Sequence, residues 1–244
     1  AGVLRERGRG EVVIATKAGS DFYHGDAGDD QGYGPIRPNY TREYLLFAAE
    51  QSLRRLNVDA LDILQLHSPD RALLERDEPW DALATLKRQG KIRHAGLSIQ
   101  SFKETEQAHL LARHADLLDC IQVRYNLLER AAEEVLFPQA QALGIGVIVR
   151  IPLLFGLLTG KFTRQSTFGA EDHRRMNLSP EKLDAYLAQL DKLGPTFDRY
   201  PGQTMAQVSL RFCLTHPACH TAIPGAKTPA QVADNCTAGD LGPL

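Results

Sequence analysis

Lys17 and His67 are the residues of this sequence whose types and positions best suit catalysis. Each closes a short apolar run that is typical of a buried parallel strand. A lysine ammonium can stabilise negative charge, and an imidazole can share a proton with a carbonyl oxygen near neutral pH. Each also has a structural explanation, because a lysine can extend into water and a histidine often only satisfies a local hydrogen bond. Their occurrence at neighbouring strand ends favours one shared catalytic pocket.

Six apolar, β-branched runs predict the strands that would position these residues. The runs cover residues 11–17, 61–67, 94–99, 120–126, 146–153 and 221–226. Helical patterns lie between them, over 41–56 with Thr41 as N-cap, 78–89 ending at Gly90, 101–114, 129–143 and 204–216. This alternation is typical of βαβ units with right-handed crossovers.

The alternation fits either an open doubly wound sheet or a closed barrel. No GxGxxG follows a strand, so the sequence favours an α/β (β/α)8 TIM barrel. That fold has eight strands, so we expect the first two βα units to be missing from this chain. Residues 1–7 resemble the tail of a helix capped by Gly8 and Gly10. Residues 1–244 are then one barrel domain that holds strands 3 to 8, with lid loops over 19–40 and 156–181.

Composition excludes several classes of partner. A net charge of -2 provides no basic field, so we expect no nucleic acid partner. No apolar run approaches the roughly 20 residues that cross a bilayer, so we expect no membrane and a cytoplasmic location. The four cysteines form no CxxC pair and no metal-ligand pattern, and we assign no metal. The sequence sets no oligomeric state.

Six strings occur in a family-specific order: EVVIATK, SLRRLNVDALDILQLH, GKIRHAGLS, IQVRYNLLER, GIGVIVRIPLLFGLLTGK and IPGAKTPAQVADN. Together they resemble the aldo-keto reductase superfamily, in particular its bacterial branch related to potassium-channel β subunits. The resemblance implies hydride transfer from NADP(H) to a small aldehyde or ketone, while a tyrosine donates a proton. Lys17 and His67 match two members of the family's Asp-Tyr-Lys-His tetrad. The Asp and Tyr would precede Ala1, so we expect the chain itself to be nearly inactive.

The resemblance also implies which residues bind the cofactor. Ser98 and Gln122 match the pair that hydrogen-bonds the nicotinamide carboxamide, although Ile99 replaces a usual Asn or Arg. Arg150 stands where many members stack an aromatic ring, and it either stacks there or pairs with an acid elsewhere. The pyrophosphate loop is matched by Pro152, Leu153, Gly156, Leu157, Lys161 and Arg174. The adenosine half is matched by Gly225, Lys227, Gln231, Asp234 and Asn235.

Two other functions compete with carbonyl reduction. A lysine at the end of a barrel strand is also the nucleophile of Schiff-base aldolases, although the cofactor residues argue against that chemistry. A non-catalytic NADP(H)-binding or regulatory protein would keep the cofactor residues without the tetrad. Lys227 and Gln231 match the positions that contact the adenosine 2′-phosphate. This favours NADPH over NADH, both for a reductase and for a non-catalytic NADP(H)-binding protein.

Overall fold

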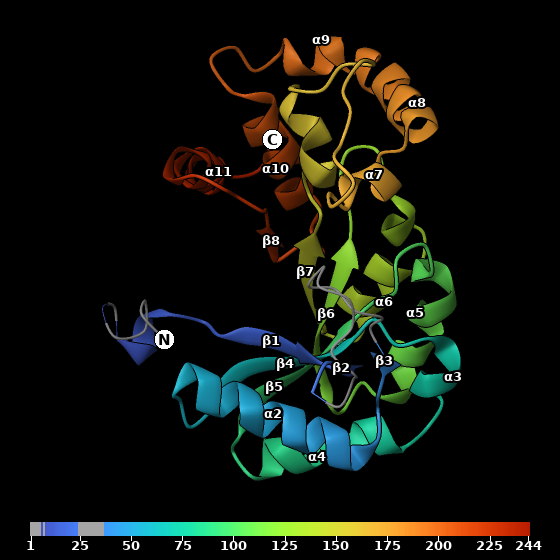
Figure 1. The fold of residues 1–244 in the computed structure, drawn as a ribbon, viewed down its shortest axis with the longest axis vertical. Helices are drawn as coiled ribbons and strands as arrows, with labels where there is room; N and C mark the ends of the chain where they lie inside the picture. The colour runs from blue at the N-terminus through green and yellow to red at the C-terminus, as the bar shows by residue number, and fades with distance from the viewer. Residues whose placement is uncertain (1–5, 7, 24–36) are drawn as a thin grey trace. The chain divides into compact units, whose positions relative to one another are not determined.

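A computed structural model describes residues 6, 8–23 and 37–244 of the chain. The chain divides into two compact units (Figure 1). Unit 1 comprises Ala1–Val123 and Val135–Gly146, and unit 2 comprises Arg124–Glu134 and Val147–Leu244. The helix expected over residues 1–7 and most of the loop 19–40 lie outside the described residues.

The parallel strands of unit 1 determine where its polar residues lie. The sheet runs β1 (Ala15–Ala18), β4 (Leu61–His67), β5 (Ile92–Ser98) and β6 (Leu118–Arg124), in that order. The strand expected over 11–17 begins later than predicted, at Ala15, and Arg9–Glu11 form a 3-10 turn (η1). Beyond β1, β2 (Ser20–Asp21) pairs antiparallel with β3 (Arg37–Pro38).

The helices of unit 1 are α2 (Arg42–Leu56), α3 (Arg71–Leu74), α4 (Glu78–Arg88), α5 (Glu104–Arg113) and α6 (Leu136–Ala142). Thr41 caps α2 as predicted, since its side chain accepts the backbone N–H of Tyr44. The helix expected over 129–143 is wrong as one element: it divides into η2 (Ala131–Glu133) and α6. Pro138 explains the break, because it has no N–H to donate to the carbonyl of residue 134.

Two carboxylates anchor the amino ends of the unit 1 strands. Asp62 accepts the backbone N–H of Ile14 at 2.7 Å and pairs with Arg9 and Arg93 at 2.8 and 2.7 Å. Burial raises the pKa of Asp62, but these partners outweigh it and hold the pKa below its usual value. Asp119 repeats the arrangement with the Ala95 N–H and the Lys87 ammonium. In barrels this strand face serves stability, whereas the opposite face carries chemistry.

Unit 2 contains β7 (Gly146–Arg150, beginning at the last residue of unit 1), which pairs with β8 (Thr221–Ile223). Both strands end earlier than predicted. Each is followed within two residues by a proline, Pro152 or Pro224, which cannot donate to a strand ladder. After β7 the chain turns through η3 (Leu154–Thr159), where Phe155 and Gly156 have φ of 56° and 93°.

The remaining helices of unit 2 are α7 (Arg174–Asn177), α8 (Pro180–Asp191), α9 (Gly194–Phe197), α10 (Met205–Thr215) and α11 (Pro229–Leu241). Helix α8 was not predicted, although Ser179 caps it and its apolar residues have helical spacing. Its leucines pack into one core with the leucines of η3 and Leu178. None of the described helices is both long and apolar enough to cross a membrane.

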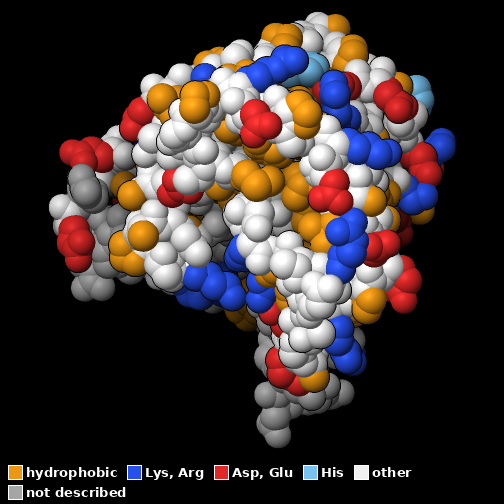
Figure 2. Space-filling view, turned by 90° about the horizontal axis from the view of Figure 1, so that it is seen from above, with side chains coloured by type: hydrophobic (Ala, Val, Ile, Leu, Met, Phe, Trp, Pro, Cys, Tyr) orange, Lys and Arg blue, Asp and Glu red, His pale blue; other side chains and the backbone are white. Residues whose placement is uncertain are grey.

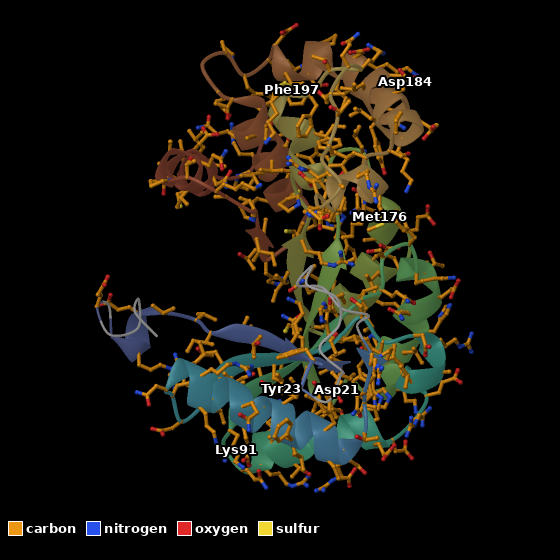
Figure 3. All side chains as sticks on the ribbon, viewed as in Figure 1. Asp21, Tyr23, Lys91, Met176, Asp184 and Phe197 are labelled. Atoms are coloured by element: carbon orange, nitrogen blue, oxygen red, sulfur yellow. The ribbon has the colours of Figure 1, made fainter. Side chains whose placement is uncertain are left out.

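Acidic and basic side chains are interspersed over the face visible in Figure 2. Several of them pair across neighbouring elements within a unit. In unit 2, for example, Arg164 pairs with Asp184 and Asp191 of α8 at 2.9 and 3.0 Å, and Asp184 is labelled in Figure 3. Such exposed pairs contribute little to stability, on the order of 0 to 1 kcal/mol each.

Candidate functional site

The sheet of unit 1 brings its predicted polar residues to one edge. His67 is aligned with Ser98, and Ser98 with Gln122, so the three form a row across β4, β5 and β6. Lys17 is aligned with Gln65, two residues before His67. Aligned residues and residues two apart share a face of a sheet, so Lys17 projects on the same face as His67. All of them lie at the carboxyl ends of the strands, where barrel enzymes carry their chemistry.

Three side chains hold the end of β4 in place. Ser20 Oγ lies 3.2 Å from His67 Nδ1, and the Tyr40 hydroxyl donates to the His67 carbonyl oxygen at 2.5 Å. The Tyr44 hydroxyl donates in turn to the Ser20 carbonyl at 2.6 Å. Burial, with a smaller contribution from Asp70, raises the pKa of the Tyr40 phenol above its usual value. The Tyr40 hydroxyl is therefore a structural donor that stays protonated.

A cavity of about 270 Å³ lies within unit 1 beside His67. Its lining includes the Ser20 and Ser68 side chains, Tyr40 and the Asp70 carboxylate. Gly19 also lines it, with a φ of 117°, and a Cβ there would lie 2.3 Å from Tyr40 Cε1. Only glycine fits this backbone, so Tyr40 packs directly against the chain that follows Lys17.

The two tyrosines that follow Lys17 most closely are Tyr23 and Tyr33. Tyr23 stacks on Phe22 at 4.4 Å between ring centroids and meets Phe47 edge to face at 5.1 Å. Its backbone N–H donates to Asp21, and both residues are labelled in Figure 3. Tyr33 lies outside the described residues. Tyr23 is thus part of an aromatic cluster rather than of the row at the strand ends.

Unit 2 has a larger cavity of about 690 Å³. All the cofactor residues predicted from the end of β7 onward line it, with the exception of Leu157. They are Arg150, Pro152, Leu153, Gly156, Lys161, Arg174, Gly225, Lys227, Gln231, Asp234 and Asn235. Residues more than 80 positions apart in the sequence are thereby brought to one place. The cavity size lies within the range of roughly 300 to 1,000 Å³ that is usual for ligand sites.

Leu157 is not among the residues that line this cavity, and its assignment to the pyrophosphate loop stays a prediction. Its side chain is fully buried and packs in the core with Leu154, Leu158 and Leu183. The left-handed conformations of Phe155 and Gly156 turn the chain between them, so Gly156 borders the cavity while Leu157 enters the core.

Four basic side chains line the cavity of unit 2: Arg150, Lys161, Arg174 and Lys227. Arg174 donates from its guanidinium to both carboxylate oxygens of Asp172, and this contact lowers the pKa of Asp172. Lys161 and Lys227 have no ion pair with any residue that the structure describes. The lining therefore holds four basic side chains and one carboxylate, that of Asp234.

The start of α11 forms another part of the wall. Thr228 caps the helix by accepting the Gln231 N–H, and the Gln231 side chain accepts the Lys227 N–H at 2.7 Å. Asp234 accepts from Thr204 Oγ1 at 3.1 Å and from Gln207 Nε2 at 2.8 Å. These contacts fix Asp234 and join α11 to the cap of α10. The amino end of a helix with an adjacent lysine is a favourable place for an anion.

Several lining residues were not predicted from the sequence. They are Ile151, Phe155, Thr159, His173, Thr204, Ala206, Ile223 and Ala226. His173 stands between Asp172 and Arg174, so its position next to the predicted cofactor residue Arg174 could have indicated that it lines the site. Ile151 and Ile223 are ordinary apolar residues near strand ends, and only the fold gives them a place in the wall.

The residues of the cavity fit the anionic phosphates of a nicotinamide dinucleotide. Positive side chains and a helix amino end border one space, and a Cβ built on Gly225 would meet no heavy atom within 4 Å. That open backbone allows a ligand to approach closely. Within the described residues there is no group of three or more His, Cys, Asp or Glu side chains that could hold a metal ion.

Comparison with known proteins defines the class. The model of the aldo/keto reductase family matches residues 2–244, and the chain belongs to that family. It is 32% identical over 235 residues to the aldo-keto reductase YhdN of Bacillus subtilis, covering 94% of this chain and 66% of that protein. It is 31% identical to a probable voltage-gated potassium channel subunit beta of Arabidopsis thaliana, covering 99% of this chain and 73% of that one.

The solved structures agree on the fold. The glycerol dehydrogenase AKR11B4 of Gluconobacter oxydans superposes with a TM-score of 0.77 at 28% identity, covering 95% of this chain and 68% of that one. The chain thus has the (β/α)8 barrel fold of the family, of which the described residues hold six parallel strands. It spans about two thirds of the length of the curated relatives it matches. The family consists generally of oxidoreductases, which typically bind a nicotinamide cofactor.

Proposed function

We propose that the protein is an NADPH-dependent oxidoreductase that reduces aldehydes or ketones to alcohols by hydride transfer. The observation that carries this proposal is the cavity of unit 2, where Lys161, Arg174 and Lys227 border one space with the start of α11. Its excess of basic side chains over carboxylates suits the phosphates of a dinucleotide. Membership of the aldo/keto reductase family supports the same chemistry.

The two parts of the cavity have different roles in this proposal. Gly156, Lys161 and Arg174 hold the pyrophosphate that NADH and NADPH share. Lys227 and Gln231, at the start of α11, hold the 2′-phosphate that only NADPH carries, while Asp234 and Asn235 contact the adenine. When bound, the cofactor supplies the hydride, and Ser98 and Gln122 orient its carboxamide.

His67 and Lys17 act on the substrate oxygen. The His67 imidazole donates a hydrogen bond to the carbonyl oxygen, with Ser20 holding its Nδ1 side. The Lys17 ammonium would lower the pKa of the tyrosine that donates the proton to this oxygen in the family's reaction. The 270 Å³ cavity beside His67, with its hydroxyls and the Asp70 carboxylate, suits a small polar carbonyl compound.

The reaction also needs a proton donor, and a general acid contributes about 10² to 10⁴-fold in rate. Tyr40 cannot replace the proton donor, because its hydroxyl is committed to the His67 carbonyl and burial raises its pKa.

NADPH oxidation tests the proposal. The protein is mixed with NADPH and a panel of aldehydes and ketones, and loss of the reduced nicotinamide absorbance is followed. We expect turnover, and loss of turnover in Lys17→Met and His67→Gln. A folded protein that binds NADPH but oxidises it with no member of the panel would refute the reductase proposal.

A non-catalytic NADP(H)-binding or regulatory function is the second candidate. It is favoured by the 31% identity to a probable potassium channel subunit beta, which covers nearly the whole chain. The same assay separates the two functions, because a regulatory protein would bind NADPH tightly and leave it unoxidised. For either function we propose a cytoplasmic location, supported by four cysteines that are all free thiols.

A further inference from the structure

One aromatic ring lies under two of the cations that border the cavity of unit 2. The Lys161 ammonium is 5.0 Å from the centroid of the Phe162 ring, and the Arg174 guanidinium carbon is 5.7 Å from it. Phe168 meets Phe162 edge to face at 5.2 Å, and its centroid is 5.0 Å from the same guanidinium carbon. We call Phe162 and Phe168 the aromatic pair. Neither phenylalanine lines the cavity itself, so the pair forms a layer behind its charged wall.

Arg174 is fixed by contacts on two sides. Its Nε donates to both oxygens of Asp172 at 2.9 Å, and Nη2 donates to the same carboxylate. The aromatic pair supports the guanidinium as well, and both rings pack against the leucine core of unit 2. An arginine held in this way presents its remaining N–H groups in a set direction.

Lys161 is held by packing alone. The structure describes no acidic partner for its ammonium, whereas the Phe162 ring lies beneath it. A Cβ built on Gly156 would lie 3.1 Å from both Lys161 Cε and Nζ, so the lysine tip rests directly on the glycine backbone. Gly156 and Phe162 together set the position of this charge.

Two like charges at one site repel, and the ring reduces this cost. The face of an aromatic ring is negative and attracts a cation within about 6 Å of its centroid. Phe162 attracts both Lys161 and Arg174, while Asp172 neutralises only one of them. The result is a local excess of positive charge that is already in place before an anion arrives, which lowers the entropic cost of binding.

We propose that Phe162, supported by Phe168, is a positioning residue that presets Lys161 and Arg174 to bind the phosphates common to NADH and NADPH. This inference rests on the proposed cofactor function. It assigns a role to an apolar residue outside the cavity wall. It also separates this subsite from Lys227, which stands in the loop between β8 and α11 and belongs to the part proposed to hold the 2′-phosphate.

The test compares both cofactors on Phe162→Leu. Dissociation constants for NADH and NADPH are measured by calorimetry with the 244-residue chain. Losing one ring shared by two cations should weaken both cofactors by a similar factor, about three- to tenfold. Phe162→Tyr keeps a ring face and should restore most of the affinity. Phe197→Leu is the matched control, because Phe197 packs against the same leucine core without contacting these cations and should leave both constants unchanged.

A fluorinated ring separates charge attraction from packing. Replacing Phe162 by trifluorophenylalanine keeps the shape but withdraws charge from the ring face, so it should weaken both cofactors while the melting temperature stays near that of the parent. This variant carries the test if Phe162→Leu fails to fold. Unchanged constants in the fluorinated variant, or a loss confined to NADPH, would overturn the inference. If the unmodified chain binds neither cofactor, the proposed function itself is refuted.

Discussion

The polar residues of unit 1 and the cavity residues of unit 2 are positioned by different means. In unit 1 the register of parallel strands places His67, Ser98 and Gln122 in one row. In unit 2 turns with positive φ, a helix cap and ion pairs gather residues from β7 to α11. Strand ladders therefore organise the first site, whereas irregular turns and side-chain contacts organise the second.

This difference predicts where each unit is vulnerable. A strand ladder depends on close backbone spacing, so unit 1 should be most sensitive to added volume between strands. Unit 2 depends on buried polar partners, so it should be most sensitive to the loss of one member of a pair.

The largest effect is expected at the buried ion pair of unit 2. Arg124 donates to both carboxylate oxygens of Glu129, and the two side chains are only 5% and 12% exposed. Asn126 and Tyr186 donate to the same carboxylate. Arg124→Ala leaves this carboxylate without its counter-charge and should lower the free energy of unfolding by about 3 to 5 kcal/mol.

Urea denaturation measures this loss. Arg164→Ala is the control, because Arg164 pairs with Asp184 and Asp191 on the surface, where it is 51% exposed. The control should cost less than about 1 kcal/mol. Equal losses in the two variants would contradict the claim that buried pairs organise unit 2.

The next effect tests backbone spacing in unit 1. A Cβ at Gly96 in β5 would lie 2.7 Å from Gln65 Cγ and 2.9 Å from Cys120 Sγ. Gly96→Ala should therefore separate β4, β5 and β6 and cost about 1 to 3 kcal/mol. Gly146→Ala is the matched control, since its nearest atom, the Asp119 carbonyl oxygen, is 3.4 Å away. Equal melting temperatures for the two variants would contradict tight packing between β4, β5 and β6 at Gly96.

A smaller effect on stability is expected at Asp62 of unit 1 when the pH of the solution is lowered. The folded-state pKa of Asp62 lies below its unfolded value of about 3.9. Its contribution is therefore fully present above that unfolded value and is lost as the pH falls through the folded pKa. Asp62→Asn should lower stability at pH 7 by about 1 kcal/mol and reduce the acid dependence.

Unfolding measured from pH 7 down to pH 3 checks the sign. Asp59→Asn changes an exposed carboxylate shortly before β4 and should leave the profile of the parent nearly unchanged. A parallel shift of the Asp62→Asn profile, with the same loss at every pH, would show that the charge of Asp62 does not stabilise the strand ends.

The strands of unit 1 were predictable because each is encoded by a short run of neighbouring apolar residues. A run such as 61–67 shows its strand directly, and the structure confirms both its ends. Helix α8 has a clear cap at Ser179, but it was not predicted: the expected loop over 156–181 included its first two residues, and no element was assigned to the rest of it. The break before α6 depended on one proline inside an otherwise helical pattern.

The cavity of unit 2 was predictable only through family resemblance. Nothing in the local pattern around Lys161 or Lys227 indicates that they share a space, because turns with positive φ and a long connection lie between them. The burial of the Leu157 side chain was not predictable for the same reason, since its direction is set by the turn at Gly156. The role proposed for Phe162 depends on where its ring lies relative to Lys161 and Arg174. An apolar residue next to a lysine in the sequence does not indicate that arrangement.

The most direct test of the account is the cofactor preference of the cavity in unit 2. NADPH and NADH are titrated against the parent chain and Lys227→Met. The account predicts tighter binding of NADPH by the parent, and a loss of about tenfold in Lys227→Met for NADPH alone, since a single charge-assisted phosphate contact is worth about 1.4 kcal/mol. Equal binding of both cofactors by the parent, or an equal loss of both in the variant, would contradict it.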